Sequence, residues 1–115
     1  MDKPDEVTTL FVYGSLLDSA RRQEIIGRRV DTIQATLHDY ELSRGRYFYI
    51  RNHPGISTKG LLLLNLTPRD FQELDRYEEI PRLYTRERVE VLDDKGNRLR
   101  SWVYLPTTFT VVDNN

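Results

Sequence analysis

The sequence predicts an α+β fold, with a mainly antiparallel sheet or barrel and a helix packed on it. Two observations carry this prediction. The chain reads as a strand and a short helix, then further strands, one longer helix and a closing hairpin. It lacks the regular strand–helix alternation that is typical of a parallel sheet. We expect a single domain over residues 1–115, with flexible tails at 1–7 and 107–115.

The first half of the chain is expected to be mostly β-structure. Apolar alternation indicates the strands, while Asp18 and Gly27 supply an N-cap and a C-terminal stop for a short helix. The expected elements are, in order, a strand at Thr8–Tyr13, a helix at Asp18–Ile26, a strand at Val30–Leu42, an aromatic core strand at Gly45–Arg51 and a turn at Asn52–Gly55.

The second half begins with an apolar segment, and a helix and a hairpin follow. Residues 60–66 are apolar on both faces, which predicts a central strand. Thr67, with Pro68 at the first turn, is a clear helix start. The remaining expected elements are a helix to Glu78 or Glu79, strands at Tyr84–Leu92 and Leu99–Leu105, and a connecting turn at Asp93–Asn97.

The composition excludes several classes of function. The chain has 17 basic and 18 acidic residues, so no nucleic-acid or anionic-membrane partner is expected. It has no cysteine, which excludes disulfides and thiol chemistry. His38 and His53 lie far apart and lack a carboxylate at metal-ligand spacing, so no metal is expected. No apolar segment has the length of a membrane span, and a cytoplasmic location is the expectation.

The first candidate site is the abrupt end of the first strand at Gly14 and Ser15. A strand that breaks at a glycine leaves N–H groups without ladder partners, and these can face an anionic or carbonyl oxygen. Such turns are common and most of them bind no ligand. Ser15 is a weak candidate for a nucleophile, because neither histidine has a visible orienting partner and the nucleophile-elbow motif is absent.

The second candidate is Glu78, near the end of the expected helix. Phe71, Leu74 and Tyr77 form the stripe that faces the core. Glu78 lies about 40° from the centre of this stripe, whereas Glu79 lies about 140° away. Burial raises the pKa of an unpaired carboxylate, which suits a general acid or base near neutral pH.

A structural ion pair is the alternative explanation for Glu78. Arg82, Arg86 and Arg88 all follow closely in the chain and could each neutralise the carboxylate. Ion pairs perturb the pKa of buried carboxylates as catalytic sites do, so helix geometry alone leaves both explanations open.

Four short segments together resemble a known family: Phe11–Leu16, Leu74–Glu78, Tyr84–Arg86 and Ser101–Tyr104. Their order and spacing over about residues 9–105 are similar to those of the γ-glutamylcyclotransferase-like superfamily. The small AIG2-like (avirulence-induced) and γ-glutamylamine cyclotransferase proteins are the branch that the chain resembles most.

The resemblance implies a small, mainly antiparallel β-barrel with flanking helices and a cavity at the barrel mouth. Tyr13, Gly14, Ser15 and Leu16 would line this cavity and hold a γ-glutamyl group, with Ser15 as a wall and hydrogen-bond donor. Glu78 matches the catalytic glutamate of the family. Behind these residues, the resemblance gives possible supporting roles to Tyr84, Arg86 and Tyr104.

The implied reaction is an intramolecular acyl transfer of the lyase type. The α-amine of a γ-glutamyl compound attacks its own γ-carbonyl and closes 5-oxoproline, with Glu78 moving the protons and no cofactor required. Two positions depart from the family pattern: Glu79 replaces a usual glycine, and Leu61 follows Gly60 where relatives have glutamate.

Two other functions remain open from the sequence. A non-catalytic small-molecule-binding module would keep the cavity without turnover. A β-rich interaction protein would instead have a filled cavity, with Glu78 paired to Arg86 or Arg88.

Overall fold

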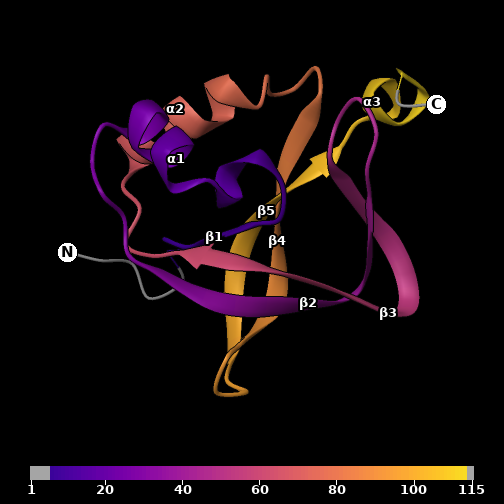
Figure 1. Cartoon of the computed structure of the whole chain (residues 1–115), viewed down its shortest axis with the longest axis horizontal. Coiled ribbons are helices and arrows are strands. Elements are labelled where there is room, and N and C mark those ends of the chain that lie inside the picture. Colours follow the sequence, from indigo (N-terminus) through magenta and orange to yellow (C-terminus); the bar gives the residue numbers. More distant parts are fainter. Residues whose placement is uncertain (1–5, 114–115) are drawn as a thin grey trace.

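Five strands form a closed barrel in the computed structural model, which describes residues 6–113 (Figure 1). The barrel and its flanking helices confirm the predicted fold class. The elements run in the order β1 (Leu10–Val12), the 3-10 turn η1 (Ser15–Leu17), α1 (Ser19–Ile26), β2 (Thr32–Ser43), β3 (Tyr49–Leu63), α2 (Pro68–Tyr77), β4 (Tyr84–Asp93), β5 (Arg98–Pro106) and α3 (Thr108–Asp113).

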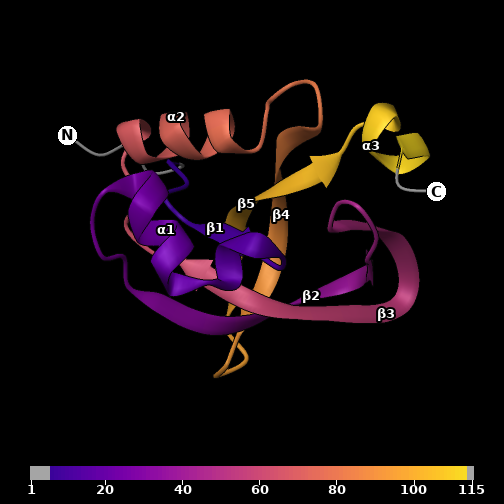
Figure 2. The same cartoon turned by 45° about the horizontal axis from the view of Figure 1, so that its top comes forward.

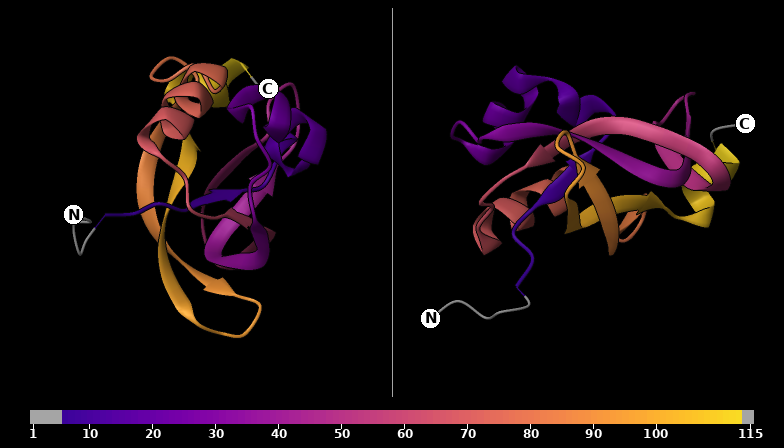
Figure 3. Two further views of the ribbon diagram at one scale, coloured as in Figure 1. Left: turned by 90° about the vertical axis from the view of Figure 1, so that its left-hand side faces the viewer. Right: turned by 90° about the horizontal axis from the view of Figure 1, so that it is seen from below.

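The barrel is mainly antiparallel, with one parallel contact that closes it. Its order is β1–β3–β2–β4–β5, and β1 pairs with β5 in parallel through Phe11 and Val103. The other ladders are antiparallel. Helices α1 and α2 lie side by side against one side of the barrel, and the β4–β5 hairpin projects from it (Figures 2 and 3).

The apolar strand expected at 60–66 is central, but it ends at Leu63 and forms the last part of the longer strand β3. Leu62 pairs with Phe11 on one side and with Ile33 on the other. Gly60 allows a close approach here, because a Cβ at this position would lie 2.2 Å from the Val12 carbonyl oxygen. The strand that leads to the site therefore packs directly on β3.

The turn expected at Asn52–Gly55 is instead a bulge within β3, so that prediction was wrong. Tyr40 of β2 pairs with Asn52 and His38 pairs with Ser57, so residues 53–56 of β3 face the single residue Asp39. The Asp39 carboxylate accepts a hydrogen bond from the Gly55 N–H at 2.9 Å. The Pro–Gly signal thus marks an interruption of one long ladder.

The apolar core has two parts. One consists of strand residues that include Phe11, Leu37 and Leu62, each almost fully buried. The other joins alternate residues of β1 to Phe71 and Leu74 of α2. Because β1 contributes to both parts, its end is held firmly where the chain turns toward η1.

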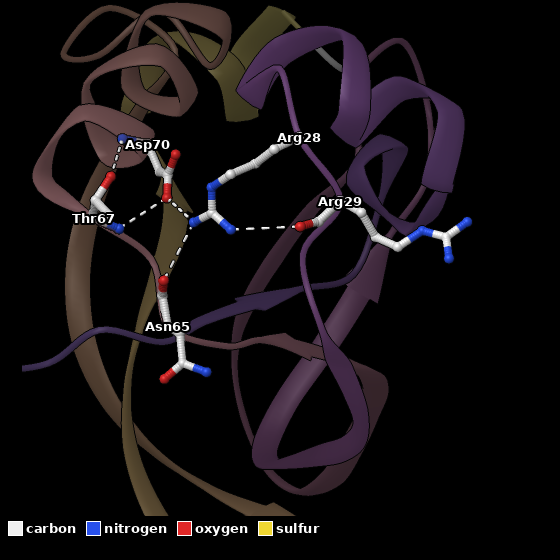
Figure 4. Close-up of polar contacts among 5 residues, drawn as sticks. All are labelled: Arg28, Arg29, Asn65, Thr67 and Asp70. Atoms are coloured by element: carbon white, nitrogen blue, oxygen red, sulfur yellow. Dashed lines mark hydrogen bonds and ion pairs between the residues drawn. The ribbon is translucent and has the colours of Figure 1, made fainter.

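The start of α2 follows the predicted capping pattern (Figure 4). The Asp70 N–H donates to the Thr67 side chain at 3.1 Å, and the Thr67 N–H donates to the Asp70 carboxylate at 2.9 Å. Arg28 also forms an ion pair with Asp70. The same guanidinium donates to the Asn65 carbonyl, so one side chain ties the segment after α1 to the start of α2.

The end of α2 comes one or two residues earlier than predicted, at Tyr77. The Ile80 N–H donates to the Asp75 carbonyl and the Glu79 N–H to the Arg76 carbonyl, both at 3.1 Å. These two bonds form a Schellman motif. Glu79 has φ of 54° and fills the left-handed position at which glycine is favoured. Glu78 is thus the capping residue rather than part of the helix.

The C-terminal segment is not a simple tail. Helix α3 occupies most of it, and the buried Thr110 hydroxyl donates to the Leu83 carbonyl at 2.6 Å. The Arg82 guanidinium lies 4.7 Å from the centre of the Phe109 ring. The expectation of a flexible tail at 107–115 was therefore wrong for α3, while residues 1–5 and 114–115 lie outside the described part.

Within residues 6–113, none of the helices combines the length and the apolar character that crossing a bilayer requires.

Candidate active site

A cavity of about 360 Å³ opens beside the end of β1. Its wall includes Tyr13–Leu16, which follow β1 and begin η1, Glu78 from the end of α2, and Tyr84 and Tyr104 from β4 and β5. Seven of the eight site residues suggested by the sequence thus line one space. The volume is in the range of pockets that enclose a small molecule.

Glu78 is the partly buried carboxylate on this wall. Burial raises its pKa to about 7, and the negative charge of Asp75 contributes in the same direction. Among the residues that the structure describes, no cation forms an ion pair with Glu78. A carboxyl group in this state can accept a proton and return it at neutral pH.

Three phenols surround Glu78 and remain protonated. Burial raises the pKa of Tyr13, Tyr84 and Tyr104, and the charge of Glu78 adds to each shift. Tyr13 donates to the Tyr104 carbonyl at 2.5 Å, and Tyr84 donates to the Phe48 carbonyl at 2.6 Å. These hydroxyl protons are directed to protein acceptors, so the phenols shape the cavity as neutral groups.

Another part of the wall is the turn at Gly14 to Leu16. The first N–H groups of η1, those of Ser15 and Leu16, have no acceptor inside this short turn. Gly14 packs closely on the next wall segment, because an added Cβ would lie 2.9 Å from the Phe48 Cβ. The Ser15 hydroxyl lies 2.9 Å from the Tyr77 hydroxyl, which fixes it as part of the wall.

The arginines expected to compete for Glu78 have other partners. Arg86 forms two hydrogen bonds with Asp75, at 2.9 and 3.2 Å, and Arg82 forms an ion pair with Glu79. The Arg88 guanidinium lies 5.6 Å from the centre of the Trp102 ring. The structural ion pair proposed as the alternative for Glu78 is therefore absent from residues 6–113.

Several lining residues were missed by the sequence analysis. Arg46, Tyr47 and Phe48 line the cavity, although residues 45–51 were expected to form a core strand. Strand β3 begins only at Tyr49, so the preceding residues are free to form the rim. The Arg46 guanidinium also lies 3.4 Å from the Asp113 carboxylate of α3. A signal was present, because Gly45 breaks the strand pattern before Arg46.

Tyr77 was expected to face the core; it packs against the core and also lines the cavity wall. Its ring is partly buried, while Phe71 and Leu74 of the same stripe are buried. The stripe therefore turns gradually from core to cavity as α2 approaches Glu78.

Residues 10–114 match the family described as gamma-glutamyl cyclotransferase, AIG2-like. The chain belongs to this family. A curated relative from Methanocaldococcus jannaschii, named gamma-glutamylcyclotransferase and putative RNase, is 27% identical over 99 residues. The match covers 84% of this chain and 45% of the relative, so the chain spans less than half of that protein's length.

Solved structures share the fold. An Arabidopsis thaliana protein has a TM-score of 0.82 at 21% identity, over 98% of this chain and 77% of that one. A gamma-glutamyl cyclotransferase has a TM-score of 0.75 at 22% identity, over 89% and 68%. An AIG2-like protein from Mus musculus has a TM-score of 0.62 at 17% identity, over 90% and 79%.

Proposed function

We propose that this protein cyclises the γ-glutamyl group of a γ-glutamyl amine or peptide to 5-oxoproline and releases the amine. The observation that carries the proposal is the state of Glu78: its pKa is raised to about 7, and it lines a small cavity together with the Gly14–Leu16 turn. Membership of the cyclotransferase family supports the reaction class.

The binding mode follows from the charges on the cavity wall. A γ-glutamyl group carries an α-ammonium and an α-carboxylate next to each other. Glu78 suits the ammonium, and Arg46 on the rim suits the carboxylate, because a guanidinium can donate two parallel hydrogen bonds to it. The γ-carbonyl oxygen would then face the N–H groups of Ser15 and Leu16.

The proposed reaction needs a base first and an acid second. Glu78 removes a proton from the α-ammonium, and the free amine attacks the γ-carbonyl carbon, so that a C–N bond forms and the carbonyl oxygen becomes negative. The amides of Ser15 and Leu16 stabilise this oxygen; a single such donor contributes about 2.7–4 kcal/mol in enzymes. Glu78 then gives its proton to the leaving nitrogen as the original C–N bond breaks, and the ring nitrogen, which still carries two hydrogens, passes one of them to the released amine, which leaves as an ammonium ion.

Formation of 5-oxoproline from a panel of γ-glutamyl amines, amino acids and peptides tests this proposal. Glu78→Gln should retain the fold and lower turnover by about 10²- to 10⁴-fold, the usual contribution of general acid–base catalysis. Glu73→Gln is the matched control, because Glu73 lies on the exposed side of α2 in an ion pair with Arg76.

The outcomes separate the alternatives. Turnover by the Gln variant at the wild-type rate would show that Glu78 does not move the protons. Binding of the panel by the wild-type protein without 5-oxoproline formation would identify a binding module that keeps the cavity but not catalysis.

A further inference from the structure

Asp75 and Arg86 form a two-point ion pair directly behind the cavity wall. Asp75 is the residue of α2 three positions before Glu78, and Arg86 comes from β4. The Arg86 Nε and Nη2 atoms donate to the two carboxylate oxygens at 2.9 and 3.2 Å. Both side chains are about three-quarters buried, with exposed fractions of 26% and 24%.

Two aromatic rings hold the guanidinium of Arg86 in place. Its central carbon lies 4.5 Å from the centre of the Phe71 ring and 4.4 Å from the centre of the Trp102 ring. Both distances are within the range of cation–π attraction. The cation is therefore fixed by α2, β4 and β5 together rather than by its carboxylate partner alone.

Tyr104 connects this ion pair to the cavity. Its hydroxyl donates to the Asp75 Oδ1 atom at 2.7 Å, and the ring lines the same cavity as Glu78. The charges of Asp75, Glu78 and Arg86 all act on the pKa of Tyr104, which places these groups around one phenol. The titratable groups that face Glu78 come from four segments: Tyr13 just after β1, Asp75 of α2, Tyr84 of β4 and Tyr104 of β5. The same cavity wall also holds Arg46, Tyr47, Tyr77 and Glu79.

We propose that Asp75 is a positioning residue: it holds and neutralises the Arg86 guanidinium, so that this cation does not pair with Glu78. The proposal rests on the proposed function of Glu78. A guanidinium stays charged at any pH that the fold tolerates. Without Asp75, a partly buried cation would lie beside Tyr104, whose ring lines the same cavity as Glu78, with its own partner removed. Pairing with Glu78 would relieve the cost of burying it.

A purely structural role makes a different prediction. If the Asp75–Arg86 pair only fastened α2 to β4, its removal would lower stability and leave the titration of Glu78 to burial and to the lost charge of Asp75. If the pair protects Glu78, the effect of removing Asp75 must depend on whether Arg86 is still present.

The experiment is a ¹³C NMR titration of the Glu78 carboxyl group in protein labelled at glutamate. The resonance is assigned by its loss in Glu78→Gln. Both Asp75→Asn and the double variant Asp75→Asn/Arg86→Gln remove the like charge, but only the single variant leaves the cation uncompensated. We expect Glu78 to titrate lower in the single variant than in the double variant by about one pH unit or more, a tenfold change in proton affinity.

Equal Glu78 titration in these two variants would overturn the proposal. Glu73→Gln is the control and should leave the resonance unchanged, since that residue pairs with Arg76 on the exposed side of the helix. If Asp75→Asn does not fold, Arg86→Gln takes its place. In Arg86→Gln the Glu78 pKa must lie above its wild-type value, because the charge of Asp75 is no longer offset. An unchanged Glu78 pKa would overturn the proposal.

The titration does not need turnover, so it separates this inference from the proposed function. If the wild-type protein shows no cyclising activity but Glu78 titrates in the variants as expected, the proposed function is refuted and the role of Asp75 stands. Where turnover is present, the acid limb of the kcat/KM profile should move to lower pH in Asp75→Asn and recover in the double variant. If the protein is active but the kcat/KM profiles of Asp75→Asn and of the double variant are identical, the role of Asp75 is refuted and the proposed function stands.

Discussion

The hydroxyls of Ser15 and Tyr77 lie 2.9 Å apart and join two segments that are 62 residues distant in the chain. One segment is the turn after β1, and the other is the last residue of α2 before Glu78. Arg21 of α1 also donates to the Tyr77 hydroxyl at 3.3 Å. The amide wall of the cavity is thereby tied to the carboxylate wall through side chains.

Tyr77→Phe should weaken substrate binding while leaving the fold intact. The variant removes the hydroxyl that connects the two walls, and a single neutral hydrogen bond contributes about 0.5–1.5 kcal/mol, or roughly a 2- to 10-fold change in affinity. Ser15→Ala leaves the Arg21 contact intact and should have an equal or smaller effect, and the double variant should be no worse than Tyr77→Phe alone. Affinities measured by calorimetry check this, and strictly additive losses would show that the two hydroxyls act separately.

Glu78 should make the folded protein less stable as the pH rises through neutrality. Its pKa is 4.5 in the unfolded reference and about 7 in the fold, so the fold favours the protonated form. The resulting stabilisation is complete below pH 4.5 and is lost as the pH rises to about 7. The difference of 2.5 units corresponds to about 3 kcal/mol.

Urea unfolding of the wild-type protein and Glu78→Gln checks this linkage. We expect the Gln variant to gain stability relative to the wild type between about pH 5 and about pH 8. A constant difference between the two proteins over this range would mean that the Glu78 carboxyl titrates normally.

Glu79→Gly should stabilise the protein. The φ of 54° at this position costs an L-residue about 1–2 kcal/mol relative to glycine. The Arg82 ion pair that would be lost has both side chains more than half exposed, so it contributes little. A rise in melting temperature of several degrees is expected. Glu79→Ala is the control, because it loses the ion pair but keeps the Cβ, and it should not stabilise.

Asp70→Ala should destabilise the protein by about 1–2 kcal/mol at neutral pH, the usual cost of losing a helix cap. Although burial opposes it, the Thr67 N–H and the Arg28 guanidinium hold the pKa of Asp70 below its usual value. This stabilisation is present above the unfolded pKa of 3.8 and is lost as the pH falls through the folded value. Unfolding curves of the variant and the wild type should therefore converge in acid, and a constant gap would argue against the ionised cap.

The parts of the fold that the sequence predicted depend on neighbouring residues. The start of α2 follows from Thr67 and Asp70, which are three residues apart and satisfy each other's backbone N–H groups. The bulge at residues 53–56 could not be distinguished from the turn expected at Asn52–Gly55, because the same residue types suit both. The long-range pairing of β3 with β2 decides between them. Helix α3 has six residues and depends on contacts with the segment before β4.

In the candidate site, too, the features set by neighbouring residues could be predicted and those set by long-range contacts could not. Glu78 could be selected from helix geometry, because its neighbours define which face of α2 is buried. The role of Asp75 could not, because Arg86 reaches it from a strand whose position depends on barrel closure. Arg46 was misassigned for a related reason: β3 begins at Tyr49, four residues later than the strand expected from Gly45.

The parallel contact between β1 and β5 has a consequence for folding. It pairs Phe11 with Val103, and the Tyr13 hydroxyl reaches across the same seam to a carbonyl 91 residues away, that of Tyr104. Contacts of such high sequence separation form late and slowly, because a long loop must first close. The cavity wall is built across this seam, so ligand binding should be acquired only in the final step of folding. A ligand would then slow unfolding without accelerating refolding.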